Sequence, residues 1–150
     1  MTREPTYAAM FAFFAGLTGG GAPLFKTATR NLAHWDTVPG EDCPCLLLRQ
    51  GKETARYKQG MPTVWTLSPM LWLYVRTNFQ NDPNQIVGSI INPLVDAIEA
   101  SIKIDDFTNH RCTLGGIVSH CAIQGTLEII EGTMGDEAVA IIPLEIVVSP

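Results

Sequence analysis

The stretch that decides the fold is residues 117–148, which read IVSHCAIQGTLEIIEGTMGDEAVAIIPLEIVV. Its first part, Ile117–Ile130, alternates apolar and polar residues, as a strand does when one face is buried and the other is wet. Gly132–Glu137 has the glycines and acids of a hairpin loop, and Ala138–Val148 then resumes the alternation. The stretch therefore predicts a β-hairpin. Pro143 lacks a backbone donor, which favours an edge position or a bulge in the second strand.

Two segments earlier in the chain have the apolar spacing of helices. Thr6–Leu17 repeats large apolar side chains at helical intervals, and its first threonine can cap the helix. Gly19-Gly20-Gly21 then predicts a flexible loop after this helix. Asp82-Pro83 predicts the start of a second helix, whose apolar stripe continues to Ile102 and is the strongest helical signal in the chain.

Three strands are predicted between the two helices. They cover Phe25–Asp36, Pro44–Gln50 and Val64–Asn78, which are rich in residues that favour strands. The intervening segment Gln50–Gly60 is polar and basic, so we expect an exposed hairpin tip or a mobile loop there. Pro69 inside the third of these strands predicts a bulge or an unpaired edge position.

The order of these elements is α, β, β, β, α, β, β. It predicts one α+β domain over residues 1–150, in which residues 1–24 form the N-terminal helix and glycine-rich loop. We expect an antiparallel or mixed sheet of about four to five strands, with the two main helices packed on one face.

The composition excludes several classes of protein. The 150 residues carry a formal net charge of −5, and 46% of them are hydrophobic. These values exclude a disordered chain and a basic nucleic-acid binder of the usual kind. No apolar run reaches the ~18 residues of a transmembrane helix, and the apolar segment near the start lacks the basic leader of a signal peptide. We therefore expect a folded domain with no membrane association.

Negative charge is concentrated in residues 112–150, which hold five acidic residues and no lysine or arginine. The simplest interpretation is a solvated acidic face that aids solubility. Two alternatives are a wall that faces something negative without binding it, and a surface that docks onto a basic partner.

The four cysteines do not form a recognised metal or redox motif. Cys43 and Cys45 are separated by one residue, so they lack the C-x-x-C spacing of a zinc knuckle or a thioredoxin-type site. Cys112 and Cys121 have histidines nearby, but strand alternation should send His120 and Cys121 to opposite faces. Free reduced thiols are therefore expected, with a disulfide or a metal site as alternatives.

The candidate catalytic pairs have simpler interpretations. Ser119 and His120 are adjacent in a predicted strand, so their side chains point to opposite faces. His34 and Asp36 share a face and could form an acid–base pair, but an exposed polar edge explains them as well. Asp105-Asp106 could bind a cation or simply end a helix. We therefore expect no enzyme activity, no catalytic residues, no cofactor and no metal.

Surface features are the more informative part of the sequence. Large aromatic side chains such as Trp35, Trp65 and Trp72 are numerous for a chain of this size, and most of them should fill the core. Two predicted edge strands and a basic hairpin are nevertheless typical of a self-assembling module, because edges can pair, aromatics can anchor and charges can set the register.

Three groups of strand and turn residues carry a resemblance to a known family. They are Trp35 with Pro39 and Pro44–Leu48; Leu73–Val75 with Ile91–Glu99; and Thr113–Gly116 with Val118, His120, Cys121, Gly125 and Ala138–Val148. Over roughly residues 25–148 this pattern resembles the tail terminator proteins of long-tailed bacteriophages, also called tail completion or minor tail protein U-like proteins. The match is a pattern of strands and turns and contains no catalytic motif.

The resemblance implies a structural virion protein. Subunits of this family form a six-fold ring that caps the head-proximal end of the tail tube, stops its polymerisation and offers a docking surface to the head-completion or connector proteins. DNA passes through the lumen without specific binding. The family has no cofactor and no catalytic residues, and the protein would be assembled in the host cytoplasm and lie in the virion neck, at the head–tail junction.

Two sets of residues become candidates for this role. The first would contact neighbouring subunits or partners, through apolar anchors and through basic side chains that face acids next door. The second would line the lumen and repel DNA phosphates. The first set is Arg49, Lys52, Arg56, Lys58 and Trp65, and the second is Glu128, Glu131, Asp136 and Glu137.

Three other functions compete with this interpretation. The nearest is another component of the same neck, either a head–tail joining protein or a tube protein. A second is a small enzyme or metal-binding domain that uses Cys112, Cys121 and His110. A third is an α+β binding module with no viral role.

Overall fold

The computed structural model describes residues 1–31, 37–77, 81–131 and 136–149 of the chain. The described residues contain two α-helices, α1 (Arg3–Ala15) and α2 (Gly88–Ser101), and a short 3-10 helix at Gly40–Asp42. Among these residues no helix is long and apolar enough to span a bilayer. The strands are β1 (Thr18–Gly19), β2 (Ala22–Pro23), β3 (Thr27–Thr29), β4 (Cys45–Arg56), β5 (Val64–Arg76), β6 (His120–Ile123), β7 (Glu128–Glu131) and β8 (Glu137–Val148).

The main sheet has six strands in the order β3-β4-β5-β8-β6, and β7 also pairs with β8. Its strand pairs are antiparallel except for the short parallel pair of β3 and β4. The chain is therefore an α+β protein with a mixed sheet, as predicted. The predicted number of strands, four to five, is too low, because the expected single strand Ile117–Ile130 is divided into β6 and β7.

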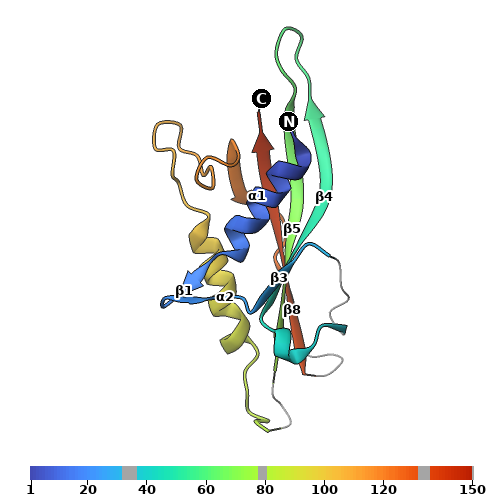
Figure 1. Cartoon of the computed structure of the whole chain (residues 1–150), viewed down its shortest axis with the longest axis vertical. Coiled ribbons are helices and arrows are strands. Elements are labelled where there is room, and N and C mark those ends of the chain that lie inside the picture. The colour runs from blue at the N-terminus through green and yellow to red at the C-terminus, as the bar shows by residue number, and fades with distance from the viewer. Residues whose placement is uncertain (32–36, 78–80, 132–135, 150) are drawn as a thin grey trace.

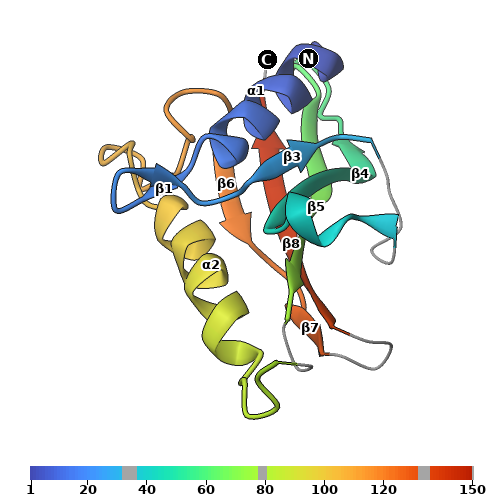
Figure 2. The same ribbon diagram turned by 60° about the horizontal axis from the view of Figure 1, so that its bottom comes forward.

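Both helices lie on one face of this sheet (Figures 1 and 2). α1 buries Tyr7, Met10 and Phe14, so the predicted helical spacing is confirmed. α2 buries one apolar stripe in the same way. Both stripes belong to a single core cluster with the inward-facing residues of the strands, and this burial supplies most of the drive to fold. The stripe of α2 is Ile91, Val95 and Ile98, and its sheet partners include Leu46, Leu71, Leu73, Ile142 and Ile146.

The opposite face of the sheet carries no α-helix among the described residues. A smaller apolar cluster lies on the part of this face next to the short 3-10 helix. Its buried members are Val38, Cys45, Leu47, Tyr74 and Val139. We call this side of the sheet the helix-free face. Alternation along the strands assigns every other residue of β4, β5, β7 and β8 to it.

The break between β6 and β7 explains how Pro143 fits into β8. β8 is interior, because it pairs with β5 on one side and with β6 and β7 on the other, so the expected edge position is wrong. The carbonyl of Pro143 accepts a hydrogen bond from the Gln124 amide at 3.2 Å. The proline nitrogen, which has no hydrogen to donate, faces the same side, where the break leaves no acceptor that needs it among the described residues. Gly125 has φ +123°, and a Cβ there would lie 3.1 Å from the proline ring.

β4 and β5 form a long antiparallel hairpin with a bulge in its middle. Arg49 pairs with Met70 and Lys52 with Ser68, so two residues of β4 stand opposite Pro69. The bulge predicted from Pro69 is confirmed. The loop or tip predicted for Gln50–Gly60 is partly wrong, because β4 continues to Arg56 and the tip itself begins at Tyr57.

Other predicted boundaries also move. α2 begins at Gly88, not at Asp82-Pro83, where the Asp82 side chain instead accepts a bond from the Asn84 amide in a turn. Of the predicted strand Phe25–Asp36, the described part is strand only at Thr27–Thr29, and residues 32–36 lie outside the described residues. The triple glycine forms a hairpin turn between β1 and β2 in place of the expected flexible loop, with Gly20 and Gly21 at positive φ.

Candidate functional site

The end of the β4–β5 hairpin projects beyond the packed body of the molecule, at the top of Figure 1. Its tip carries two large apolar side chains in solvent, Tyr57 at 74% exposure and Met61 at 57%. Single exposed apolar residues are ordinary, but two on one projecting turn are a marked feature. The hairpin is therefore the first candidate for a contact with another molecule.

Four basic residues accompany these apolar side chains. Arg49, Lys52, Arg56 and Lys58 are all exposed. The β4–β5 register places the first three on the helix-free face, and the Arg49 guanidinium lies 5.7 Å from the centre of the Trp72 ring there. None of the four forms an ion pair with another residue of the described ranges. Within the described ranges, therefore, no acidic side chain neutralises their charge.

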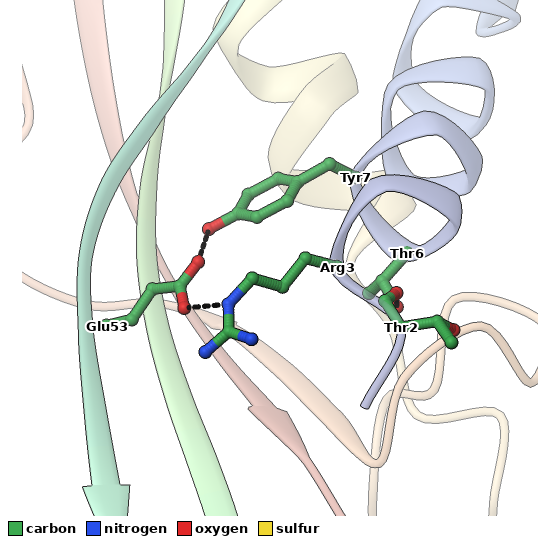
Figure 3. A network of polar contacts seen from close by, with 5 residues as sticks. All are labelled: Thr2, Arg3, Thr6, Tyr7 and Glu53. Atoms are coloured by element: carbon green, nitrogen blue, oxygen red, sulfur yellow. Dashed lines mark hydrogen bonds and ion pairs between the residues drawn. The ribbon is translucent and has the colours of Figure 1, made fainter.

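The first turns of α1 contact the β4–β5 hairpin through Arg3, Tyr7 and Glu53, and we call this set of contacts the brace (Figure 3). Arg3 Nε donates to Glu53 Oε2 at 2.7 Å, and the Tyr7 hydroxyl donates to Glu53 Oε1 at 3.2 Å. The Arg3 guanidinium also lies 4.5 Å from the centre of the Trp65 ring. A single arginine therefore contacts both strands, β4 through Glu53 and β5 through Trp65, and it covers part of the tryptophan predicted as an interface residue.

Burial keeps the Tyr7 hydroxyl protonated. Tyr7 is fully buried, and this desolvation, followed by the nearby Glu53 charge, raises the pKa of Tyr7 to about 12. The phenol therefore stays a hydrogen-bond donor across the physiological pH range, as its bond to a carboxylate requires.

A shallow pocket of about 610 Å³ opens where the bulge interrupts the hairpin. Arg49 and Lys52 line it from β4, and Glu145 lines it from β8. The pocket is open to solvent and carries charges of both signs, so it continues the polar surface of the hairpin and does not form an enclosed ligand site.

Acidic residues gather at the other end of the sheet, where β7 pairs with the first half of β8 (Figure 2). Glu128 and Glu131 are exposed, but strand alternation puts them on opposite faces, with Glu128 on the helix-free face. Glu137 is bound to Arg76 of β5 at 2.6 Å, and only 12% of its side chain is exposed. Asp136 is half-buried, and its carbonyl accepts the Thr77 amide at 2.6 Å.

Apolar side chains accompany the two exposed acids of β7. Leu127 is 37% exposed and Ile130 is 40% exposed. β7 pairs with β8 along one edge only, so its other edge carries unpaired backbone groups within the described part of the chain.

The candidate catalytic residues that the structure describes make structural contacts. The Ser119 hydroxyl contacts the Ser149 hydroxyl at 2.6 Å, and His120 Nδ1 accepts the Cys112 amide at 3.4 Å, so serine and histidine do not meet. The Asp105 carboxylate accepts bonds from Thr113 and Gly115, which orders the loop after α2. The pair His34 and Asp36 lies outside the described residues, as does Trp35.

The described residues contain no group of three metal-binding side chains, and their four cysteines are free thiols. Burial raises the pKa of the Cys121 thiol to about 12 and that of Cys43 to about 11, which makes both weak nucleophiles. His110 lies in the loop after α2, exposed and at φ 53°.

Two surface features were missed at the level of sequence. The first is the contact between Arg3 and Glu53, which are 50 residues apart in sequence. The only signal for it is that Glu53 is the one acidic residue in the basic segment 49–58. Phe107, at 78% exposure, and Ile104, at 47%, are exposed apolar residues of the loop after α2, and no periodic pattern in the sequence identified them. No protein-family model matches this sequence, and no curated protein matches it either.

Proposed function

We propose that this chain is a ring-forming structural subunit that caps the head-proximal end of a phage tail tube. The ring would stop tube polymerisation and provide the docking surface for the head-completion or connector proteins. The observation that carries the proposal is the projecting β4–β5 hairpin, whose basic side chains form no ion pair among the described residues and whose tip exposes two large apolar side chains. Such a hairpin suits a protein that acts by contact with its neighbours.

Termination requires a ring with two unlike faces. One face must bind the last ring of the tube, and the other must lack the surface on which the tube grows. Neighbouring subunits would meet through sheet edges and the hairpin, where Arg49, Lys52, Arg56 and Lys58 would face acids. Each exposed ion pair contributes only ~0.2–1 kcal/mol, so apolar anchors such as Tyr57 and Met61 must supply most of the affinity.

The acidic part of the chain would border the channel through which DNA moves. Carboxylates on this wall would repel phosphates, so the genome would slide without binding. Glu128 and Asp136 are the stronger candidates, since Glu131 lies on the opposite face of β7 and Arg76 neutralises Glu137. The hexameric number of subunits comes from the family resemblance alone.

Electron microscopy of the purified protein tests the proposal, together with its mass in solution. A terminator should form a single ring, or should stay small until tail tubes are present and then bind to their ends. Growth into long tubes would instead identify a tube protein. Binding along the tube wall, or placement away from the head–tail junction in a virion map, would contradict the proposed role.

A further inference from the structure

We propose that the hairpin tip of one copy docks onto the outer edge of β7 in the next copy. The tip patch consists of Arg56, Tyr57, Lys58 and Met61, and the β7 patch consists of Leu127, Glu128, Ile130 and Glu131. The inference rests on the proposed function and names the surface that each subunit offers to its neighbour.

The two patches are complementary in charge and in apolar content. The tip patch has two exposed cations beside two exposed apolar side chains. The β7 patch covers both faces of the strand edge: Glu128 and Ile130 lie on the helix-free face, and Glu131 lies on the opposite face. Leu127, the fourth exposed residue of the patch, directly precedes the strand. Opposite charges around an apolar centre are the usual arrangement of a specific protein contact, in which the charges set the register and the apolar groups supply affinity.

The two patches cannot meet within one chain. Arg56 pairs with Val64 of β5. β7 pairs with the part of β8 that in turn pairs with Trp72–Val75, farther along β5. At about 3.3 Å per residue the two levels are roughly 26–36 Å apart along the strands. Figure 1 shows the tip at one end of the long axis, and Figure 2 shows β7 at the other end.

When the two patches of one copy contact two different neighbours, the contact is heterologous and joins copies head to tail. Such a contact closes into a ring when the rotation between copies allows it, and otherwise it grows into an open chain. The outer edge of β7 is the natural docking surface, because its backbone groups are unpaired within the described residues and its two acids flank the edge from both faces. Glu128 would then border both this contact and the channel.

Charge reversal on each patch tests the inference. One variant carries Arg56→Glu and Lys58→Glu, and a second carries Glu128→Lys and Glu131→Lys. Each should weaken self-association by at least about tenfold, because two attractive pairs become repulsive. An equimolar mixture of the two should associate again, since each tip then meets a β7 patch of opposite charge, and a mixed ring must contain an even number of copies.

A matched control reverses charges elsewhere on the surface. Asp96→Lys with Lys103→Glu changes two exposed residues of α2 and the segment after it, and should leave association unchanged. Mass is measured by sedimentation at low ionic strength, and thermal unfolding shows that every variant is folded.

Each outcome bears on a different statement. Variants that associate like the native chain, a mixture that fails to recover, or a native chain that stays monomeric at high concentration would each overturn the docking inference. Single rings that are insensitive to these reversals would leave the terminator proposal standing without this contact. Mixtures that recover as open chains would support the contact and contradict the ring.

Discussion

At the scale of single residues, two features limit which substitutions the fold tolerates: close contacts at glycines and the burial of ionisable side chains. Gly51 stands in the bulge of β4, where a Cβ would overlap the carbonyl oxygen of Ser68. Rotation of a side chain cannot relieve that contact, because the backbone fixes the position of the Cβ and the oxygen is itself a backbone atom. Gly125 is a milder case at the break between β6 and β7, where a Cβ would lie 3.1 Å from the ring of Pro143 and the backbone has φ +123°.

Gly51→Ala should destabilise the fold by about 2–3 kcal/mol, because the backbone of the hairpin must shift to admit a methyl group. Urea unfolding followed by circular dichroism measures the change. Gln50→Ala, one residue earlier and exposed, is the matched control and should have little effect. Equal stability of the two variants would contradict the close approach.

Stability should fall as the pH rises above about 9. Burial raises the pKa of Cys121 from 9.0 to about 12, and of Tyr7 and Tyr74 from 10.0 to about 12. These groups hold their protons more tightly in the folded state, so their contribution is complete below the unfolded pKa and is lost as the pH climbs toward the folded one. Urea unfolding at pH 8 and pH 10.5 measures the loss.

Cys121→Ala should reduce this pH dependence while also lowering stability at pH 8 through the small cavity it creates. Gln59→Ala, an exposed change that removes no ionisable group, is the comparison and should leave the dependence as it is. A native chain that is equally stable at both pH values would refute the argument.

At the scale of elements, the notable feature is how α1 and the β4–β5 hairpin depend on each other. Arg3 and Tyr7 converge on Glu53, and the same arginine lies over Trp65. The bulge lies below this brace and the free tip lies above it. We therefore expect these contacts to hold the hairpin against α1.

Glu53→Gln should loosen the hairpin without unfolding the domain. The Arg3 side chain is 50% exposed, so loss of the ion pair should cost less than about 1 kcal/mol. Backbone amides of residues 54–63 should exchange with deuterium faster, while those of β8 keep their protection. Glu4→Gln, which removes the separate contact to Arg30, is the control. Unchanged exchange at the tip would show that the brace does not hold the hairpin.

At the scale of the whole molecule, the long axis separates two patches of opposite charge. The cations of the hairpin tip lie at one end and the exposed acids of β7 at the other. This polarity is a property of the assembled sheet, because β7 and the tip are more than 60 residues apart in sequence. It allows the contact proposed above, in which the tip of one copy meets β7 of the next.

Arg56→Glu with Lys58→Glu should impair ring formation or joining to tail tubes while leaving thermal unfolding unchanged. Both side chains are exposed and neither forms an ion pair within the described residues, so the isolated fold does not depend on them. Calorimetry gives the unfolding temperature, and sedimentation gives the mass. Loss of the fold itself would refute the assignment of these residues to an interface.

Several features could be predicted from local pattern. The spacing of Tyr7, Met10 and Phe14 identified α1, alternation identified β8, and Pro69 identified the bulge. The basic, exposed character of the hairpin was also visible, because charge and turn residues are read from neighbours in sequence. Boundaries were less reliable: turn chemistry at Asp82 resembles a helix start, yet the helix begins at Gly88.

The sequence by itself determined the class of fold, since periodicities of two and of about 3.6 specify which faces seek burial. Only the tertiary structure decided that β8 is interior despite Pro143, that Glu53 binds Arg3, and that Glu128 and Glu131 face opposite ways. These facts depend on which strands pair and in which register. Pairing is set by the summed packing of distant segments, which no local pattern contains.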